Sequence, residues 1–181
     1  MFKSIEELLN ALASPNGIIR QQARYELVKI GNPALKHLVE FQSSDKHLAR
    51  WEAVKAISEI GTKESIPILI KALEDDEFDV RWLAAEGLID IGHSSIYPLL
   101  RAFISNKDSA HLKESVHHVL KGLELRGSYE DKYKIIKSLE TFTTPLKLEL
   151  NIINLLSDEL MMPRNDQNDT KKDNQDNIKA G

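Results

Sequence analysis

The residues best suited to chemistry in this chain are its histidines, which can bind metal ions and transfer protons near neutral pH. Glu114 and His118 are four residues apart, and His111 lies one turn before Glu114. On a helix these three side chains would share one face, where a weak divalent-cation site is conceivable. A solvated charged face is the favoured interpretation of the same spacing. We therefore predict no metal site; the remaining histidines are His37, His47, His93 and His117.

Other reactive arrangements are absent from the sequence. The chain has no cysteine, which rules out disulfides, thiolate nucleophiles and zinc sites that need a sulfur ligand. No Ser/His/Asp spacing, glycine-rich phosphate loop or Walker-type lysine occurs. We predict no catalytic residue and no cofactor. These absences favour a protein that is not an enzyme, without settling the question.

The composition describes an ordinary soluble protein of one domain. Of its 181 residues, 41% are hydrophobic, the mean hydropathy is −0.34 and the formal net charge is −4. The negative charge disfavours nucleic acid as a partner. No run of about 18 apolar residues predicts a membrane span, and the N-terminus lacks a secretory pattern. We expect a cytoplasmic protein.

An internal repeat is the strongest pattern in the chain. Residues 79–92 match residues 49–61 when Arg81 is aligned with Arg50, and an earlier copy follows Arg20. A fainter copy has Lys113 in place of the arginine. The basic residues stand at positions 20, 50, 81 and 113, so successive copies are 30, 31 and 32 residues apart. Helical repeats of this length form solenoids.

Each copy contains two predicted helices. Apolar residues at relative positions 0, 3, 4 and 7 precede each basic residue, as in Ile66, Leu69, Ile70 and Leu73, and this spacing marks one face of an α-helix. No strand-like alternation persists. We predict an all-α superhelix of about five helical hairpins in residues 1–162, with repeats at about 4–31, 32–61, 62–92 and 93–125 and a divergent capping pair at 128–161.

The predicted helix ends carry their own signals. Gly31, Gly61 and Gly92 follow the last apolar residue of a second helix, where a left-handed closing residue is needed. Ser4 begins a capping box, and Asn32 before a proline predicts another N-cap. Residues 163–181 are rich in Asn, Asp, Gln and Lys, and we predict a disordered polar tail there.

The motif Asp-Val-Arg-x-x-Ala-Ala-x-x-Leu-x-x-Ile-Gly, which begins at Asp79, resembles the HEAT-like repeats named after phycobilin lyases. Residues 4–123 fit that pattern. The resemblance implies an α-solenoid but no single activity, since such repeats occur in scaffolds, adaptors, bilin lyases, iron hydroxylases and DNA glycosylases. It also implies that Asp79, Arg20, Arg50 and Arg81 make structural contacts between repeats. Lys113 departs from the pattern, so this ladder of contacts is expected to be incomplete.

A partner surface is expected on the second helices, which line the concave side of a solenoid. Positions +3, +7 and +10 after each basic residue are apolar, so positions +1, +2, +5 and +9 are predicted to project outward. Both tryptophans occupy these positions, with the acidic residues Glu52, Glu59, Glu86 and Asp90 around them. We predict a groove with an aromatic floor and an acidic rim. Its candidate binding residues are Tyr25, Trp51, Lys55, Trp82, Leu83, Glu86, Asp90 and His118.

Several interpretations stay open at this point. The tryptophans also suit the gap between adjacent second helices, and the solvent exposure of Trp82 separates that interpretation from partner binding. A scaffold or adaptor for a protein segment with basic and apolar residues is favoured. A bilin lyase-like or bilin-handling protein is an alternative, but the sequence offers no obvious acid-base pair for that role. A DNA-alkylation-repair-like glycosylase would suit the one-turn spacing of Trp82 and Glu86, but it lacks a lysine-arginine stripe.

Overall fold

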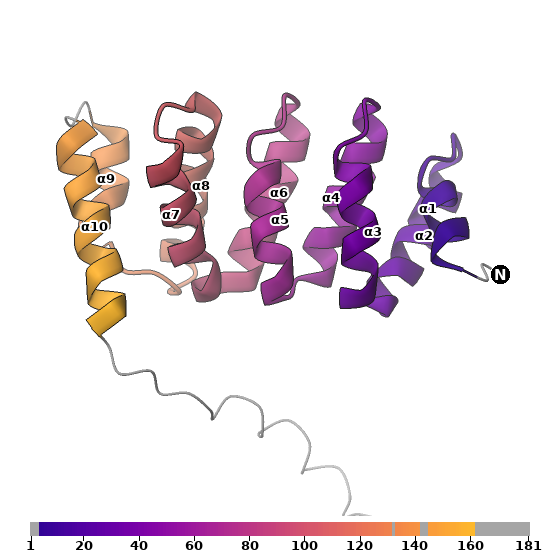
Figure 1. Cartoon of the computed structure of the whole chain (residues 1–181), viewed down its shortest axis with the longest axis horizontal. Helices are drawn as coiled ribbons and strands as arrows, with labels where there is room; N and C mark the ends of the chain where they lie inside the picture. Colours follow the sequence, from indigo (N-terminus) through magenta and orange to yellow (C-terminus); the bar gives the residue numbers. More distant parts are fainter. Residues whose placement is uncertain (1–3, 132, 142–144, 162–181) are drawn as a thin grey trace, which may run out of the picture.

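Two layers of α-helices build the protein in the computed structural model (Figure 1), which describes residues 4–131, 133–141 and 145–161. These residues contain no strand. The predicted all-α solenoid of five helical hairpins is therefore confirmed. The helices are α1 Ile5–Leu12, α2 Gly17–Ile30, α3 Asn32–Gln42, α4 His47–Ile60, α5 Ile66–Ala72, α6 Phe78–Ile91, α7 Ile96–Ser105, α8 Ala110–Leu125, α9 Ile135–Glu140 and α10 Pro145–Met161, with short 3-10 helices Lys63–Ser65 and Gly92–Ser95 before α5 and α7.

The second helices α2, α4, α6 and α8 pack side by side as one layer. Their mutual contacts are more extensive than those between the first helices α1, α3, α5 and α7, as expected where the second helices line the inner side of a curved stack. The last pair is reversed: α9 contacts α8, and α10 contacts α7 (Figure 1). The terminal pair therefore continues the two layers in the opposite order.

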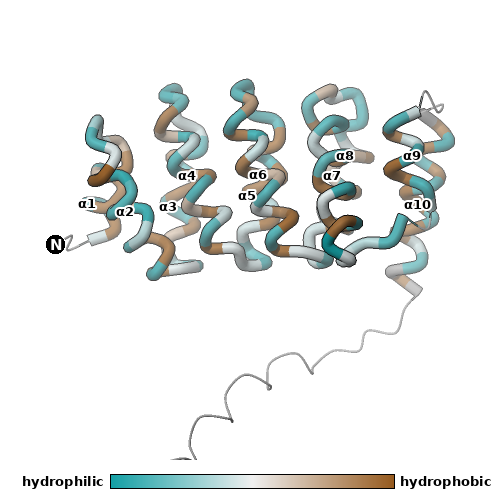
Figure 2. The backbone as a smooth tube through the Cα atoms, turned by 180° about the vertical axis from the view of Figure 1, so that it is seen from behind, coloured by the Kyte–Doolittle hydropathy of each residue, from teal (hydrophilic) through white to brown (hydrophobic). Residues whose placement is uncertain are grey.

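The core lies between the two layers and runs through every repeat. Fully buried side chains include Leu12, Leu38, Leu69 and Leu99 of the first helices, which come from the predicted apolar stripe. Leu27, Leu88 and Leu120 face them from the second helices. Figure 2 shows apolar residues recurring on helix after helix. Because each repeat buries its apolar face only against its neighbours, the stack is stabilised as a whole.

The helix ends follow most of the predicted signals. Ser4 caps α1 by accepting a hydrogen bond from the amide of Glu7 at 3.2 Å. Gly31, Gly61 and Gly92 all have positive φ, at 71°, 62° and 81°. Residues with a Cβ atom rarely adopt this conformation. The predicted cap at Asn32 is wrong. Its side chain instead accepts a hydrogen bond from the Thr62 hydroxyl of the next repeat at 2.7 Å.

The terminal helix α10 is apolar on two sides. Leu148, Ile152 and Leu155 are buried against the core, whereas the opposite side exposes four large apolar residues. A solenoid cap presents a polar outer face, so α10 does not have the surface expected of the capping pair. The exposed residues are Leu146, Leu150, Ile153 and Leu160.

Two further expectations concern the ends of the chain and the membrane. The predicted disordered tail at 163–181 lies outside the described residues. Among the helices that the structure describes, none combines the length and the apolar character needed to cross a membrane.

Candidate protein-binding surface

Four aromatic side chains gather on the outward side of the second helices, and we call them the aromatic face: Tyr25 of α2, Trp51 of α4, and Phe78 and Trp82 of α6. Tyr25 is 62% exposed, Phe78 64% and Trp82 47%. Trp51 is half-buried and packs partly against the core. Sequence reasoning missed Phe78, although its position one turn before Trp82 places both residues on one side of a helix.

The prediction that position +2 projects outward is wrong. Leu83, Glu52 and Ser115 occupy this position in α6, α4 and α8, and they are only 5%, 3% and 7% exposed. Position +2 faces the preceding second helix, which covers it. Gln22 holds the same position in α2 and is exposed, because no second helix precedes α2 in the described chain. Leu83 is therefore removed from the candidate binding residues.

Glu52 is instead the centre of a buried ionic contact between the first two repeats. Its carboxylate accepts from Arg20 Nε at 2.8 Å and from Arg24 Nη1 at 2.5 Å. All three side chains are largely covered, with 4% of the Glu52 side chain exposed, 18% of Arg20 and 14% of Arg24. The contact joins α2 to α4 and so fixes the position of Tyr25 relative to Trp51.

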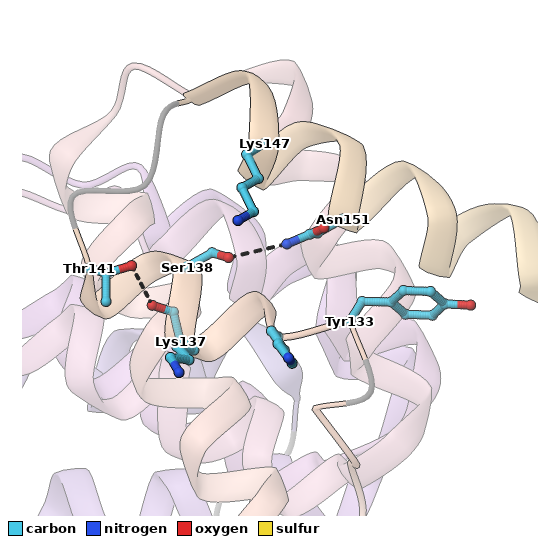
Figure 3. Close-up of a pocket in the computed structure, with 7 residues that line it drawn as sticks. Tyr133, Lys137, Ser138, Thr141, Lys147 and Asn151 are labelled. Carbon is cyan, nitrogen blue, oxygen red and sulfur yellow. Dashed lines mark hydrogen bonds between the residues drawn. The ribbon is translucent and has the colours of Figure 1, made fainter.

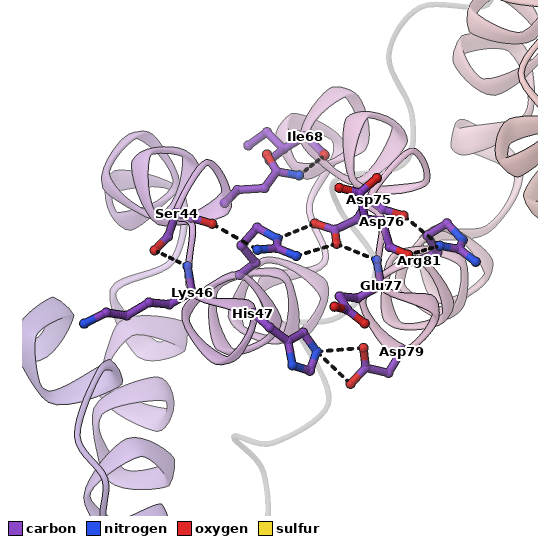
Figure 4. A network of polar contacts seen from close by, with 11 residues as sticks. Ser44, Lys46, His47, Ile68, Asp75, Asp76, Glu77, Asp79 and Arg81 are labelled. Carbon is purple, nitrogen blue, oxygen red and sulfur yellow. Dashed lines mark hydrogen bonds and ion pairs between the residues drawn. The ribbon is translucent and has the colours of Figure 1, made fainter.

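The repeated arginines hold the loops that join the two helices of their own repeats. Arg20, Arg50 and Arg81 each donate from Nη1 to loop carbonyl oxygens, those of Ser14 and Pro15, of Ser44, and of Asp75 and Asp76, at 2.7 to 3.1 Å. Figure 4 shows the last two loops meeting at one network. These bonds lie within single repeats, whereas the resemblance implies contacts between repeats. Arg20 makes such a contact through Glu52 and Arg50 through Asp75, and the bonds described here for Arg81 stay within its own repeat.

Contacts between the second and third repeats complete this network (Figure 4). Arg50 also forms a paired contact with the carboxylate of Asp75, at 2.7 and 3.0 Å. Asp79 bonds His47 Nε2 at 2.8 Å, so its contact with the neighbouring repeat is made through a histidine and not through an arginine. The bonds across the junction fix the distance between α4 and α6, the two helices that carry the tryptophans.

Asp75 should make the stability of this junction depend on pH. Burial by itself would raise the pKa of Asp75, but hydrogen bonds from Arg50 and the Glu77 amide, with nearby positive charge, hold it below its ordinary value. The folded protein thus binds this proton less readily than the unfolded chain. Its stabilisation is present above the unfolded-state pKa of about 4 and is lost as the pH falls through the lower folded-state value.

Melting temperatures of the wild type and Asp75→Asn, measured from pH 7 to pH 3, test this expectation. The variant should be less stable at neutral pH, and the difference should narrow below about pH 4 as the wild-type carboxylate becomes protonated. A difference that stays constant over the whole range would show that the Asp75 charge does not matter.

The acidic residues of the predicted rim are paired within the protein. Glu86 bonds His118 Nε2 at 2.9 Å, and Asp90 lies 2.5 Å from Arg126 Nη1. Glu59 lies 3.3 Å from Arg24 Nε and 3.6 Å from Lys55 Nζ. The side chains of Glu86 and Asp90 stay 30% and 60% exposed. A partner would therefore meet acidic groups whose charge is already partly compensated.

His111, Glu114 and His118 do not form the cation site that their spacing made conceivable, because His118 contacts Glu86 of the preceding repeat. In the described part of the chain, the one group of three potential ligands is formed by His47, Glu77 and Asp79, whose ligand atoms lie within 4.8 Å of one another. All three are exposed at the surface. Sequence reasoning missed this group because its members come from two repeats.

The fold and the repeated contacts define an α-solenoid of the HEAT type. The family model for HEAT repeats matches residues 5–88, slightly less than half of the chain. The repeat pattern found in the sequence extends further, to residue 123.

A solved structure shares this fold. The chain is similar to the complex of CpcE and CpcF of phycocyanin lyase from Nostoc sp. PCC7120, with 19% identity, a TM-score of 0.54, and coverage of 83% of this chain and 96% of that chain. Two engineered proteins are also similar, with 17% and 19% identity, TM-scores of 0.40 and 0.39, and coverage of 83% of this chain and 77% and 78% of theirs. No curated protein matches the chain. At these identities the likeness concerns the fold alone.

Proposed function

We propose that this protein is a non-catalytic scaffold or adaptor that binds a protein segment on its aromatic face. The observation that carries the proposal is the exposure of Trp82, at 47%. An indole that served only to fill the gap between two helices would be buried. Large exposed aromatic side chains on a rigid surface are the residues that most often dominate binding energy at protein interfaces.

The chemistry of the surface describes the partner. Tyr25, Phe78 and Trp82 offer apolar contact area, which suits apolar anchors on the partner segment. Glu86 and Asp90 remain partly exposed, so basic residues beside those anchors would compete with His118 and Arg126 for their carboxylates. We therefore propose a segment that carries both apolar and basic side chains, encountered in the cytoplasm.

The length of the aromatic face favours a protein segment over a small molecule as the ligand. The aromatic face extends over three successive second helices, α2, α4 and α6, and solenoids use such extended surfaces to bind chains that lie along them. The similar phycocyanin lyase structure is itself a complex of two proteins, CpcE and CpcF. This fold is thus compatible with a stable protein partner.

Replacing Trp82 by alanine should weaken partner capture about 30-fold, the loss that accompanies removal of about 2 kcal/mol at an interface hot spot. Immobilised wild type and Trp82→Ala would be exposed to lysate of the source cell, and captured proteins would be compared by quantitative mass spectrometry. Because Trp82 is nearly half-exposed, its loss should leave the melting temperature close to that of the wild type.

Leu150→Ala is a matched control, since Leu150 is 50% exposed but lies on α10 in the other layer. It should capture the same proteins as the wild type. If the Trp82→Ala and Trp51→Ala/Trp82→Ala variants also retain every partner, the aromatic face is not the binding surface. Recovery of DNA alone, or an absorbance change on mixing with a free bilin, would instead support the glycosylase or the bilin-handling alternative.

A further inference from the structure

A polar pocket lies between α9 and α10, which also contact each other directly. It has a volume of about 540 Å³. Figure 3 shows Lys147 and Asn151 of α10 extending toward Ser138 of α9. The residues that line the pocket are Tyr133, Lys134, Lys137, Ser138, Thr141, Lys147 and Asn151.

The charge of this lining is entirely positive. Lys134, Lys137 and Lys147 contribute three cations, and none of the described residues that line the pocket is an aspartate or glutamate. Within the described residues, none of the three lysines forms an ion pair, whereas Lys107, in the loop between α7 and α8, pairs with Glu149 of α10 at 2.6 Å. Three unpaired cations around one cavity repel one another, and a multiply charged anion relieves that repulsion.

Both helices and the two ends of α9 bring these groups to the same cavity. Lys137 and Ser138 belong to α9, Lys134 and Thr141 flank its two ends, and Lys147 and Asn151 are one turn apart on α10. The Asn151 amide donates to the Ser138 hydroxyl at 3.2 Å, which ties the two walls together. The Thr141 hydroxyl donates to the Lys137 carbonyl and the Tyr133 hydroxyl to Asp158. The Ser138 hydroxyl, which accepts from Asn151, is a neutral hydrogen-bond donor beside the three lysines.

The backbone at Lys134 supports a built site. Lys134 has φ 55° and ψ 37° and is, in the part of the chain that the structure describes, the one non-glycine residue with positive φ. Its conformation is held by Asp131, whose carbonyl accepts from the Lys134 amide at 2.9 Å and whose side chain caps α9 through the Ile135 amide at 2.6 Å. Such unfavourable conformations concentrate at functional sites.

We propose that the pocket between α9 and α10 binds a small molecule that carries a phosphate group. Lysine ammonium groups bind phosphate as point charges, and a phosphate has enough charge and acceptor atoms for three of them and for the Ser138 hydroxyl. The volume exceeds that of a phosphate alone and lies within the range of small-molecule sites. This proposal rests on residues outside the aromatic face and is independent of the protein-binding role.

Isothermal titration calorimetry at low ionic strength tests the site, with inorganic pyrophosphate and glucose 6-phosphate as probes and glucose as the uncharged comparison. We expect binding at one site per chain for at least one phosphorylated probe and none for glucose. Lys147→Met keeps the apolar stem and removes the charge, and it should weaken binding about tenfold. The double variant Lys137→Met/Lys147→Met should abolish binding at the concentrations used.

Lys107→Met is the control, because it removes a lysine near α10 that does not line the pocket. It should leave the affinity unchanged, and melting curves of all variants establish that they are folded. Absence of binding by the wild type, or an equal loss in Lys107→Met, would overturn the proposal. Binding of single-stranded RNA without binding of either small probe would also overturn it, in favour of a nucleic-acid surface.

Discussion

Replacing Glu52 by alanine is expected to lower the free energy of unfolding by about 3 kcal/mol. Glu52 is 3% exposed and accepts hydrogen bonds from both Arg20 and Arg24. Its removal leaves two largely covered guanidinium groups without their shared carboxylate, and an uncompensated buried charge costs more than the ion pair itself contributes. Urea unfolding followed by circular dichroism measures the change.

Glu59→Ala provides the comparison for this prediction. Glu59 also lies near Arg24, at 3.3 Å, but 35% of its side chain is exposed. Exposed ion pairs contribute about 0 to 1 kcal/mol because water screens both charges. If the two variants lose similar stability, burial of Glu52 does not have the energetic weight proposed for it. Because Glu52 joins α2 to α4, its loss should also weaken any binding that needs Tyr25 beside Trp51.

Replacing Gly87 by alanine should destabilise the fold by about 1 to 2 kcal/mol, despite the higher helix propensity of alanine. A Cβ atom at Gly87 of α6 would lie 2.7 Å from Ser58 Oγ and 2.9 Å from Ser58 Cβ of α4. The serine hydroxyl can rotate away, but its Cβ is fixed to the backbone. The two helices must therefore move apart, which disturbs a close-packed core.

Gly122→Ala tests whether the backbone is what makes Gly87 sensitive. There the nearest atom is the terminal Cδ1 of Ile89 at 2.5 Å, the end of a side chain that can change its rotamer, so the loss in melting temperature should be smaller. A double-mutant cycle of Gly87→Ala with Ser58→Gly should show a favourable coupling energy, because the second change removes the clashing atoms. Strictly additive effects would contradict the close approach of α4 and α6.

Both predictions concern the frame that supports the aromatic face. Trp51 and Trp82 lie on α4 and α6, whose separation is set by the glycine-serine contact and by the Arg50 and Asp79 bonds across the same junction. A rigid frame lowers the entropy lost on binding, since the aromatic side chains are held in place before a partner arrives. Variants that loosen this junction should therefore weaken capture even when Trp82 is intact.

The sequence predicted the helices well, but it did not predict which side chains neighbouring helices cover. The apolar spacing of the first helices and the positive φ of Gly31, Gly61 and Gly92 were predicted because each depends on residues within a few positions along the chain. Position +2 was misjudged. Its burial depends on a helix about 30 residues earlier, so local periodicity cannot distinguish Leu83 from an exposed residue.

The features of the candidate sites also differ in whether the sequence alone could predict them. The sequence by itself determined the repeat, the helical pairs, and the alignment of Trp51 with Trp82, because all of these are recorded in the spacing of residues along one chain segment. Only the tertiary structure decided that Glu52 is a buried partner of two arginines, that Phe78 extends the aromatic face, and that three lysines surround one pocket. These features arise where different helices meet, and the packing angle and order of the helices, including the reversal of the last pair, bring their side chains together.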